Sequence, residues 1–159
     1  MTALEEIAPT FVEMAHRIVW CTAATVDEAA RPRTRILHPI WEFDGDRLRG
    51  WILTSPSSVK AGHLAVTPAL SLTYWIPSHD TCTADCTTAW ETTTQEREAG
   101  WNRFAEGPAP VGYDPSIIPP WTSPEAPEFG VLRVEPFRLR VMPGTVMTTG
   151  TGAVLTWHS

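Results

Sequence analysis

The sequence predicts a mainly β protein, an antiparallel barrel or sandwich with few helices. Several short runs rich in β-branched and aromatic residues are separated by turn signals, and only two or three segments have helical character. The chain lacks both βαβ alternation and the glycine fingerprint of a dinucleotide fold. Its 159 residues are the usual size of one domain, so we expect a single domain spanning residues 1–159.

The N-terminal segment is expected to be a helix. Apolar residues recur every three to four positions from Leu4 to Met14, which predicts a helix over 2–16. Thr2 and Glu5 have the spacing of a capping box, which would satisfy the first amide groups of this helix.

Three strands should follow this helix. Residues 17–26 and 33–43 are rich in strand-forming side chains, although Pro39 indicates an edge position or a bulge. Asp44-Gly45 is a hairpin turn signal and leads directly into a strand over 47–54. This hairpin would place the strand of 33–43 beside that of 47–54.

The second half of the chain continues with short elements. They are predicted as a helix over 58–66, strands over 69–76 and 81–90, a helix over 95–104, and strands over 130–141 and 152–157. Between the last helix and the strand at 130 lies a proline-rich loop, residues 107–128, in which seven of 22 residues are Pro. Loops of this length are usually lids, interface arms or disordered. We expect this one to cover a substrate, with Tyr113 and Trp121 facing it.

Charge and cysteine content exclude several classes of protein. The net charge of −6 argues against a general nucleic-acid binder, and no polybasic run or long apolar run indicates a membrane. The acidic N-terminus does not resemble a secretory signal. Three cysteines without such a signal fit reduced thiols in the cytoplasm. Cys82 and Cys86 would be roughly 13 Å apart on one strand, too far for a disulfide.

An arginine triplet is the first candidate for anion binding. Arg31, Arg33 and Arg35 alternate along a predicted strand, so their side chains should leave one face of the sheet. Guanidinium groups bind phosphate oxygens well, and an anion would relieve their mutual repulsion. The alternative is a solvated strand face whose arginines pair with acids such as Glu42 or Asp46.

The second candidate is the hydroxyl-rich start of the helix over 58–66. Thr54, Ser55, Ser58 and Lys60 lie where a strand ends and this helix begins, and a helix N-terminus attracts anions. The alternative is an ordinary helix cap with Lys60 in water. Because the hairpin would bring the strand of Arg35 beside that of Thr54, the two candidates together favour a shared phosphate.

Three stretches carry a resemblance to a known family. They are RTRILHP at 33–39, GWILTSPSSVKAGHL at 50–64 and PALSLTYW at 68–75. In them the chain resembles the pyridoxamine 5′-phosphate oxidase-like, FMN-binding split-barrel superfamily, including its actinobacterial deazaflavin (F420)-dependent reductases. The resemblance implies a six-stranded antiparallel split β-barrel with Greek key topology. It also implies a homodimer that binds its cofactor at the dimer interface.

The resemblance also implies roles for particular residues. Arg35, Ser58 and Lys60 would bind the cofactor phosphate, and Trp157 would reach the flavin of the partner. Backbone and side chains of two strands would lie along the ring or ribityl chain. With the candidates found from the residues alone, the expected cofactor-binding set is Arg33, Arg35, Ile36, Leu37, Leu53, Thr54, Ser55, Ser58, Lys60 and Trp157. We expect no metal site and no dedicated catalytic acid.

Departures from the family pattern bear on the activity. Val59 stands where an Arg is expected and Ile40 where a Lys approaches the substrate. The Arg and His that grip pyridoxine phosphate after Trp157 are also missing. We therefore expect an FMN- or F420-dependent oxidoreductase acting on a small molecule, rather than a true pyridoxamine-phosphate oxidase. The alternative is a non-catalytic split barrel that binds a flavin, a haem or an apolar ligand.

Overall fold

The computed structural model describes residues 1–159 and contains eight strands, four α-helices and one 3-10 turn. The helices are α1 (Leu4–Ile18), α2 (Val59–Val66), α3 (Thr94–Ala105) and α4 (Thr145–Thr148), and the 3-10 turn is η1 (Pro115–Ile117). The strands are β1 (Cys21–Val26), β2 (Pro32–Leu37), β3 (Ile40–Phe43), β4 (Leu48–Leu53), β5 (Ala69–Trp75), β6 (Thr81–Glu91), β7 (Val131–Met142) and β8 (Leu155–His158).

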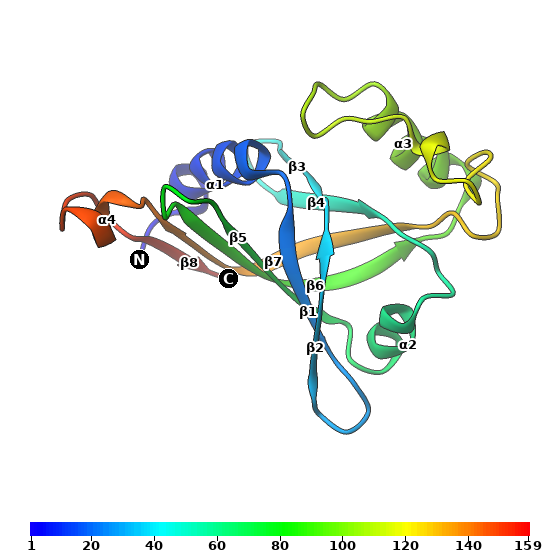
Figure 1. Ribbon diagram of the computed structural model, residues 1–159, viewed down its shortest axis with the longest axis horizontal. Helices are drawn as coiled ribbons and strands as arrows, with labels where there is room; N and C mark the ends of the chain where they lie inside the picture. Colours follow the sequence, from blue (N-terminus) through cyan, green and yellow to red (C-terminus); the bar gives the residue numbers. More distant parts are fainter.

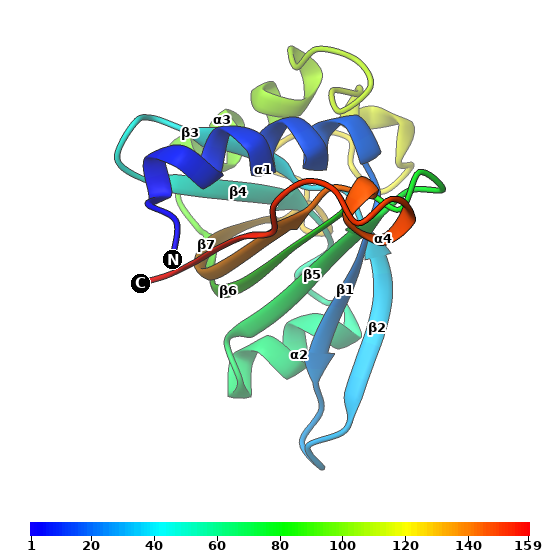
Figure 2. The ribbon, with the colours of Figure 1, turned by 90° about the vertical axis from the view of Figure 1, so that its left-hand side faces the viewer.

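All strands belong to one antiparallel sheet in the order β2-β1-β5-β6-β7-β4-β3, with β8 paired to β7. The sheet is strongly twisted, and the β1–β2 hairpin runs across the direction of β6 and β7 (Figure 1). Helix α1 covers one face, whereas α2 lies at the opposite end beside β1 (Figure 2). The predicted mainly β class is confirmed, but the sheet has eight strands instead of six and is not closed.

Helix α1 begins and ends two residues later than predicted. Its first residue follows Ala3, and no side chain caps it, so the expected capping box of Thr2 and Glu5 is wrong. Thr2 instead donates its backbone N–H to the carbonyl of Thr156, in β8, at 2.8 Å. This bond to the end of the chain takes Thr2 away from the helix terminus.

The strand predicted over 33–43 is two strands at opposite edges of the sheet. It breaks at His38-Pro39, because Pro39 lacks the N–H that a continuous ladder requires. β2 pairs only with β1, whereas β3 pairs only with β4. The Asp44-Gly45 turn is confirmed, with Gly45 at φ 99°, but it joins β3 to β4. The hairpin therefore does not place Arg35 beside the strand that leads to Thr54.

The later elements agree with the sequence. β5, β6, α3 and β7 lie within a few residues of their predicted bounds, and α3 is capped by Thr93 and Glu96. Pro136 coincides with an irregularity, because the β6–β7 register shifts between Asp85 and Cys86, the residue opposite Pro136. The short helix α4 was not predicted. None of the helices is long and apolar enough to cross a bilayer.

The molecule has two apolar clusters. The larger one lies between α1 and the sheet and includes Phe11, Trp41 and Tyr74, where the Trp41 indole N–H donates to the Tyr74 hydroxyl at 2.8 Å. The smaller one lies beneath α3 and the proline-rich loop and includes Phe104 and Phe129. The three cysteines are buried and free, so the prediction of no disulfide between Cys82 and Cys86 is confirmed.

Candidate functional site: a cationic pair beside an apolar pocket

Helix α2 reaches β2 by packing against β1. The buried hydroxyl of Thr25 on β1 is hydrogen-bonded to Nδ1 of His63 on α2 at 2.9 Å. Thr25 is paired across the ladder with Arg33 of β2, and Ala23, two residues earlier on β1, is paired with Arg35. The helix and the arginine strand are therefore adjacent, although not through the hairpin expected from the sequence.

Arg35 and Lys60 lie near enough in this region for their charges to interact, and neither has a carboxylate partner. The Arg35 guanidinium donates only to the carbonyls of Ala23 and Arg33, at 3.2 and 2.8 Å. The Lys60 ammonium donates to the hydroxyl of Ser58 at 3.1 Å. Neither forms an ion pair with an acidic side chain.

The pKa values of this pair indicate that its charges repel each other. Burial lowers the pKa of Lys60, and the positive charge of Arg35 lowers it further. Burial likewise lowers the pKa of Arg35, with a second contribution from Arg33. Two half-buried cations thus share one region with no neutralising charge from the chain, which is an arrangement that an anion would stabilise.

The other two arginines of the triplet behave differently. Arg31 pairs with Asp27 at 3.0 Å, and Arg33 lies 3.8 Å from the same carboxylate. Hydrogen bonding, first from the Arg31 backbone N–H, lowers the pKa of Asp27. The alternative of a solvated face paired with acids thus describes Arg31 and Arg33, although the acid is Asp27. Only Arg35 remains free for an external anion.

The serines at the start of α2 likewise fall into those that are paired with an acidic residue and one that is not. Ser55 and Ser57 both donate their hydroxyls to Oε2 of Glu128, each at 2.8 Å, and these bonds lower the pKa of Glu128. Ser58 precedes the helix with no side-chain capping bond, and its hydroxyl faces Lys60. The structure therefore groups Ser58 with Lys60 and Arg35, and directs Ser55 toward the last residues of the proline-rich loop.

An apolar pocket of about 360 Å³ lies under the proline-rich loop, and we call it the loop pocket. Its lining residues are Trp20, Ile36, Leu37, His38 and Leu53 from the sheet, and Pro110, Tyr113, Ile117, Ile118 and Trp121 from the loop. Because Leu37 ends β2 and Leu53 ends β4, the two halves of the sheet approach each other here. None of the lining side chains is a carboxylate, an Arg or a Lys.

The expected ring-binding residues are only partly gathered in this pocket. Ile36, Leu37 and Leu53 line it together, and Thr54 follows Leu53 with its side chain buried and its backbone N–H donated to Gly130. Trp157 lies elsewhere. It lies on β8, is paired with Leu139 of β7 and packs against the larger apolar cluster of its own chain.

Sequence reasoning did not single out Trp20 or His38 for this pocket. Their rings lie 4.8 Å apart between centroids, and His38 also lies 5.3 Å from Tyr113. The only available signal was the position of His38, three residues after Arg35 and immediately before the Pro39 that breaks the strand. Tyr113 and Trp121 do face the pocket, as the covering loop led us to expect.

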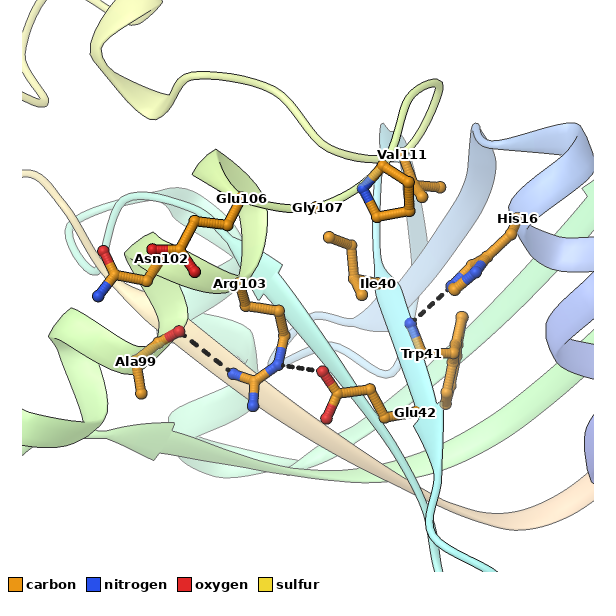
Figure 3. Close-up of a pocket in the computed structure, with 11 residues that line it drawn as sticks. His16, Ile40, Trp41, Glu42, Ala99, Asn102, Arg103, Glu106, Gly107 and Val111 are labelled. Atoms are coloured by element: carbon orange, nitrogen blue, oxygen red, sulfur yellow. Dashed lines mark hydrogen bonds and ion pairs between the residues drawn. The ribbon is translucent and has the colours of Figure 1, made fainter.

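A second cavity, of about 460 Å³, lies between α1, β3 and α3 (Figure 3). His16 accepts the backbone N–H of Trp41 at Nε2, at 2.9 Å, and burial lowers the pKa of its imidazole. Arg103 donates to Glu42 at 2.7 Å and lies over the Trp51 ring at 3.6 Å. These polar groups are already engaged by one another, unlike Arg35 and Lys60. No group of three or more His, Cys, Asp or Glu residues is arranged to hold a metal ion.

Solved structures resemble the whole chain. A Clostridium acetobutylicum protein related to general stress protein 26, of the pyridoxinephosphate oxidase family, matches with a TM-score of 0.71 and 13% identity, over 97% of this chain and 95% of that one. A pyridoxamine 5′-phosphate oxidase-related, FMN-binding protein from Nostoc punctiforme matches with a TM-score of 0.70 and 15% identity, over 99% and 92%. The fold is that of the pyridoxamine 5′-phosphate oxidase-related proteins.

This likeness is one of fold across distant sequences. A NimC/NimA family protein from Clostridium acetobutylicum also matches, with a TM-score of 0.67 and 13% identity, over 98% of this chain and 92% of that one. No protein-family model matches the chain, and no curated protein is similar to it in sequence. The predicted resemblance to the split-barrel superfamily is thus confirmed at the level of the fold.

Proposed function

We propose that the chain binds the phosphate of a flavin between Arg35 and Lys60 and functions as a flavin-dependent oxidoreductase. The observation that carries this proposal is the pair of cations that repel each other and have no acidic partner. A phosphate would neutralise both charges and accept hydrogen bonds from both side chains. The FMN-binding description of the Nostoc punctiforme protein with this fold supports the same assignment.

The residues near this pair also suit the rest of a flavin. Leu37 and Leu53, at the ends of β2 and β4, form an apolar seam in one wall of the loop pocket. A flavin placed there would supply hydride or electron transfer. The chain would hold the phosphate with Arg35, Lys60 and Ser58, and would exclude water with the apolar seam and the loop above it.

A homodimer is part of this proposal. The outward side chains of β1 and β5 are small or uncovered, and include Thr22, Thr73 and Trp75, which is 55% exposed. Trp20 and Ile36 add two more exposed apolar side chains, 59% and 60% exposed, next to the loop pocket. Flat surfaces with uncovered aromatic residues favour association with a second copy. Trp157 would contribute to a flavin site only in such a dimer.

The activity proposed is not that of a pyridoxamine-phosphate oxidase. Ile40, at the position where that enzyme has a substrate-binding Lys, is buried in the smaller apolar cluster. Val59 cannot add a second cation at the helix start. FMN is the cofactor we favour. F420 is the alternative, because it carries a phosphodiester and the site offers few cationic groups. The buried free thiols support a reducing compartment such as the cytoplasm.

In the test, the purified protein is titrated with FMN and with F420, and calorimetry measures the binding of each. Arg35→Ala and Lys60→Ala should each weaken binding by about 1.5–3 kcal/mol, the size of a charge-assisted hydrogen bond. Arg31→Ala is the matched control, because it removes an arginine of the same strand that is already paired with Asp27. The cofactor assignment fails if neither cofactor binds, or if Arg31→Ala weakens binding as much as Arg35→Ala.

A further inference from the structure

One polar atom in the wall of the loop pocket is unexplained by cofactor binding. Nε2 of His38 is buried and has no hydrogen-bond partner. The aromatic rings of Trp20, Phe104 and Tyr113 lie around this ring, and His16 is near enough to lower its pKa. An unsatisfied buried nitrogen is costly, so a partner for it is expected from outside the chain.

The protonation of His38 determines what that partner is. Burial lowers the pKa of the ring, so the imidazole is neutral at physiological pH. The backbone of Val111 raises this pKa in part, and because Nε2 has no partner we assign the proton of the neutral ring to Nδ1. A neutral ring that keeps its proton on Nδ1 presents a lone pair at Nε2. His38 is then a hydrogen-bond acceptor.

We propose that the loop pocket binds an uncharged, flat aromatic substrate whose hydroxyl or N–H group donates to Nε2 of His38. The volume of about 360 Å³ suits a molecule of one or two fused rings. Trp20, Tyr113 and Trp121 offer aromatic surfaces to such a ring, and no charged partner exists for an ionic substrate. That this ligand is the substrate rests on the proposed function, since it would lie next to the flavin seam at Leu37 and Leu53.

The test compares three probes of similar shape on the full-length protein, with and without saturating FMN. 2-Naphthol donates a hydrogen bond, 2-methoxynaphthalene can only accept one, and naphthalene does neither. By calorimetry, the wild-type protein should bind 2-naphthol about five to ten times more tightly than the other two. His38→Phe keeps an aromatic ring without the acceptor and should remove this preference. His158→Phe, at an exposed position on β8, is the control and should retain it.

A measurement on the unmodified protein covers the case in which His38→Phe does not fold. The ¹⁵N resonance of His38 Nε2 should shift when 2-naphthol is added and should not shift with 2-methoxynaphthalene. The proposal is overturned if the wild-type protein binds all three probes equally, or if folded His38→Phe keeps the preference. It is also overturned if FMN displaces 2-naphthol, because the pocket would then hold the flavin ring. Loss of FMN binding alone, with the 2-naphthol preference intact, would instead refute the proposed cofactor.

Discussion

Helices α2 and α3 both begin where a strand ends, but their first turns are satisfied in different ways. The start of α3 is closed by its own side chains, because Thr93 accepts the N–H of Glu96 and the Glu96 carboxylate accepts the N–H of Thr93. The start of α2 has no capping bond and no acidic residue, and Lys60 places a positive charge there instead. The helix that satisfies its own amide groups stabilises the fold, whereas the open one is available to an anion.

Each of the two helices contains one glycine, and only Gly100 of α3 is buried against the sheet, whereas Gly62 of α2 is exposed. A Cβ at Gly100 of α3 would lie 2.5 Å from Cγ2 of the buried Val131, whereas one at Gly62 of α2 would meet nothing within 4 Å. Gly100→Ala should therefore lower the free energy of unfolding by about 1–3 kcal/mol through overpacking. Gly62→Ala should raise it by about 0.5–1 kcal/mol. Urea denaturation measures both changes in the free energy of unfolding. Equal changes in the two variants would contradict the different surroundings of these glycines.

The capping residues should separate stability from binding. Thr93→Ala removes a capping bond and should cost about 1 kcal/mol of stability. Ser58→Ala removes none, so its stability without ligand should change by less than about 0.5 kcal/mol. FMN affinity should respond in the opposite sense, falling about fivefold in Ser58→Ala and not at all in Thr93→Ala. Thermal unfolding and FMN titration of the two variants provide the check.

Acid should weaken the N-terminal cap of α3. Hydrogen bonds, first from the Thr93 backbone N–H, hold the pKa of Glu96 below its ordinary value of 4.5. A carboxyl group with a lowered pKa in the folded state contributes stability that is complete above its ordinary pKa and is lost as pH falls through the folded-state pKa. The stability difference between the wild-type protein and Glu96→Gln should thus be present at neutral pH and should close as the pH falls through the lowered pKa of Glu96. A difference that is independent of pH would show that the carboxylate does not cap the helix.

The smallest expected effect concerns the unpaired charge on α2. Lys60→Met keeps most of the side-chain volume and removes the repulsion from Arg35 and from the helix terminus. Without ligand, this variant should be a few tenths of a kcal/mol more stable than the wild-type protein. With saturating FMN the order should reverse, because only the wild-type protein gains from phosphate binding. Melting curves of both proteins with and without FMN provide the measurement. If FMN leaves the order of their melting temperatures unchanged, Lys60 does not contact the phosphate.

Local patterns predicted most of the elements correctly. Turn and propensity signals placed the hairpin turn at Gly45 and the bounds of β5, β6, α3 and β7, since each of these depends on neighbouring residues. The capping box at Thr2 failed because a distant residue, Thr156, takes its backbone N–H. A bond to the far end of the chain leaves no mark in the local pattern.

The candidate site could be predicted in its residues but not in its construction. Arg35 and Lys60 were identified from their residue types and positions, yet the reason given for their meeting was wrong. The break at His38-Pro39 sends β2 and β3 to opposite edges, and α2 reaches Arg35 through the contact between Thr25 and His63. The pairing of Arg31 with Asp27, and of Ser55 with Glu128, depends on side-chain geometry that no spacing reveals.

The loop pocket lies where the outermost strands come together around His38-Pro39. No ladder of backbone hydrogen bonds joins β2 to β3 or to β4, and two residues of continuous chain are what connects these edges. A seam held only by covalent linkage and side chains can widen without breaking any sheet pairing. A planar ligand can therefore bind between the two halves of the sheet by breaking only van der Waals contacts, while every strand keeps its hydrogen-bonded partners.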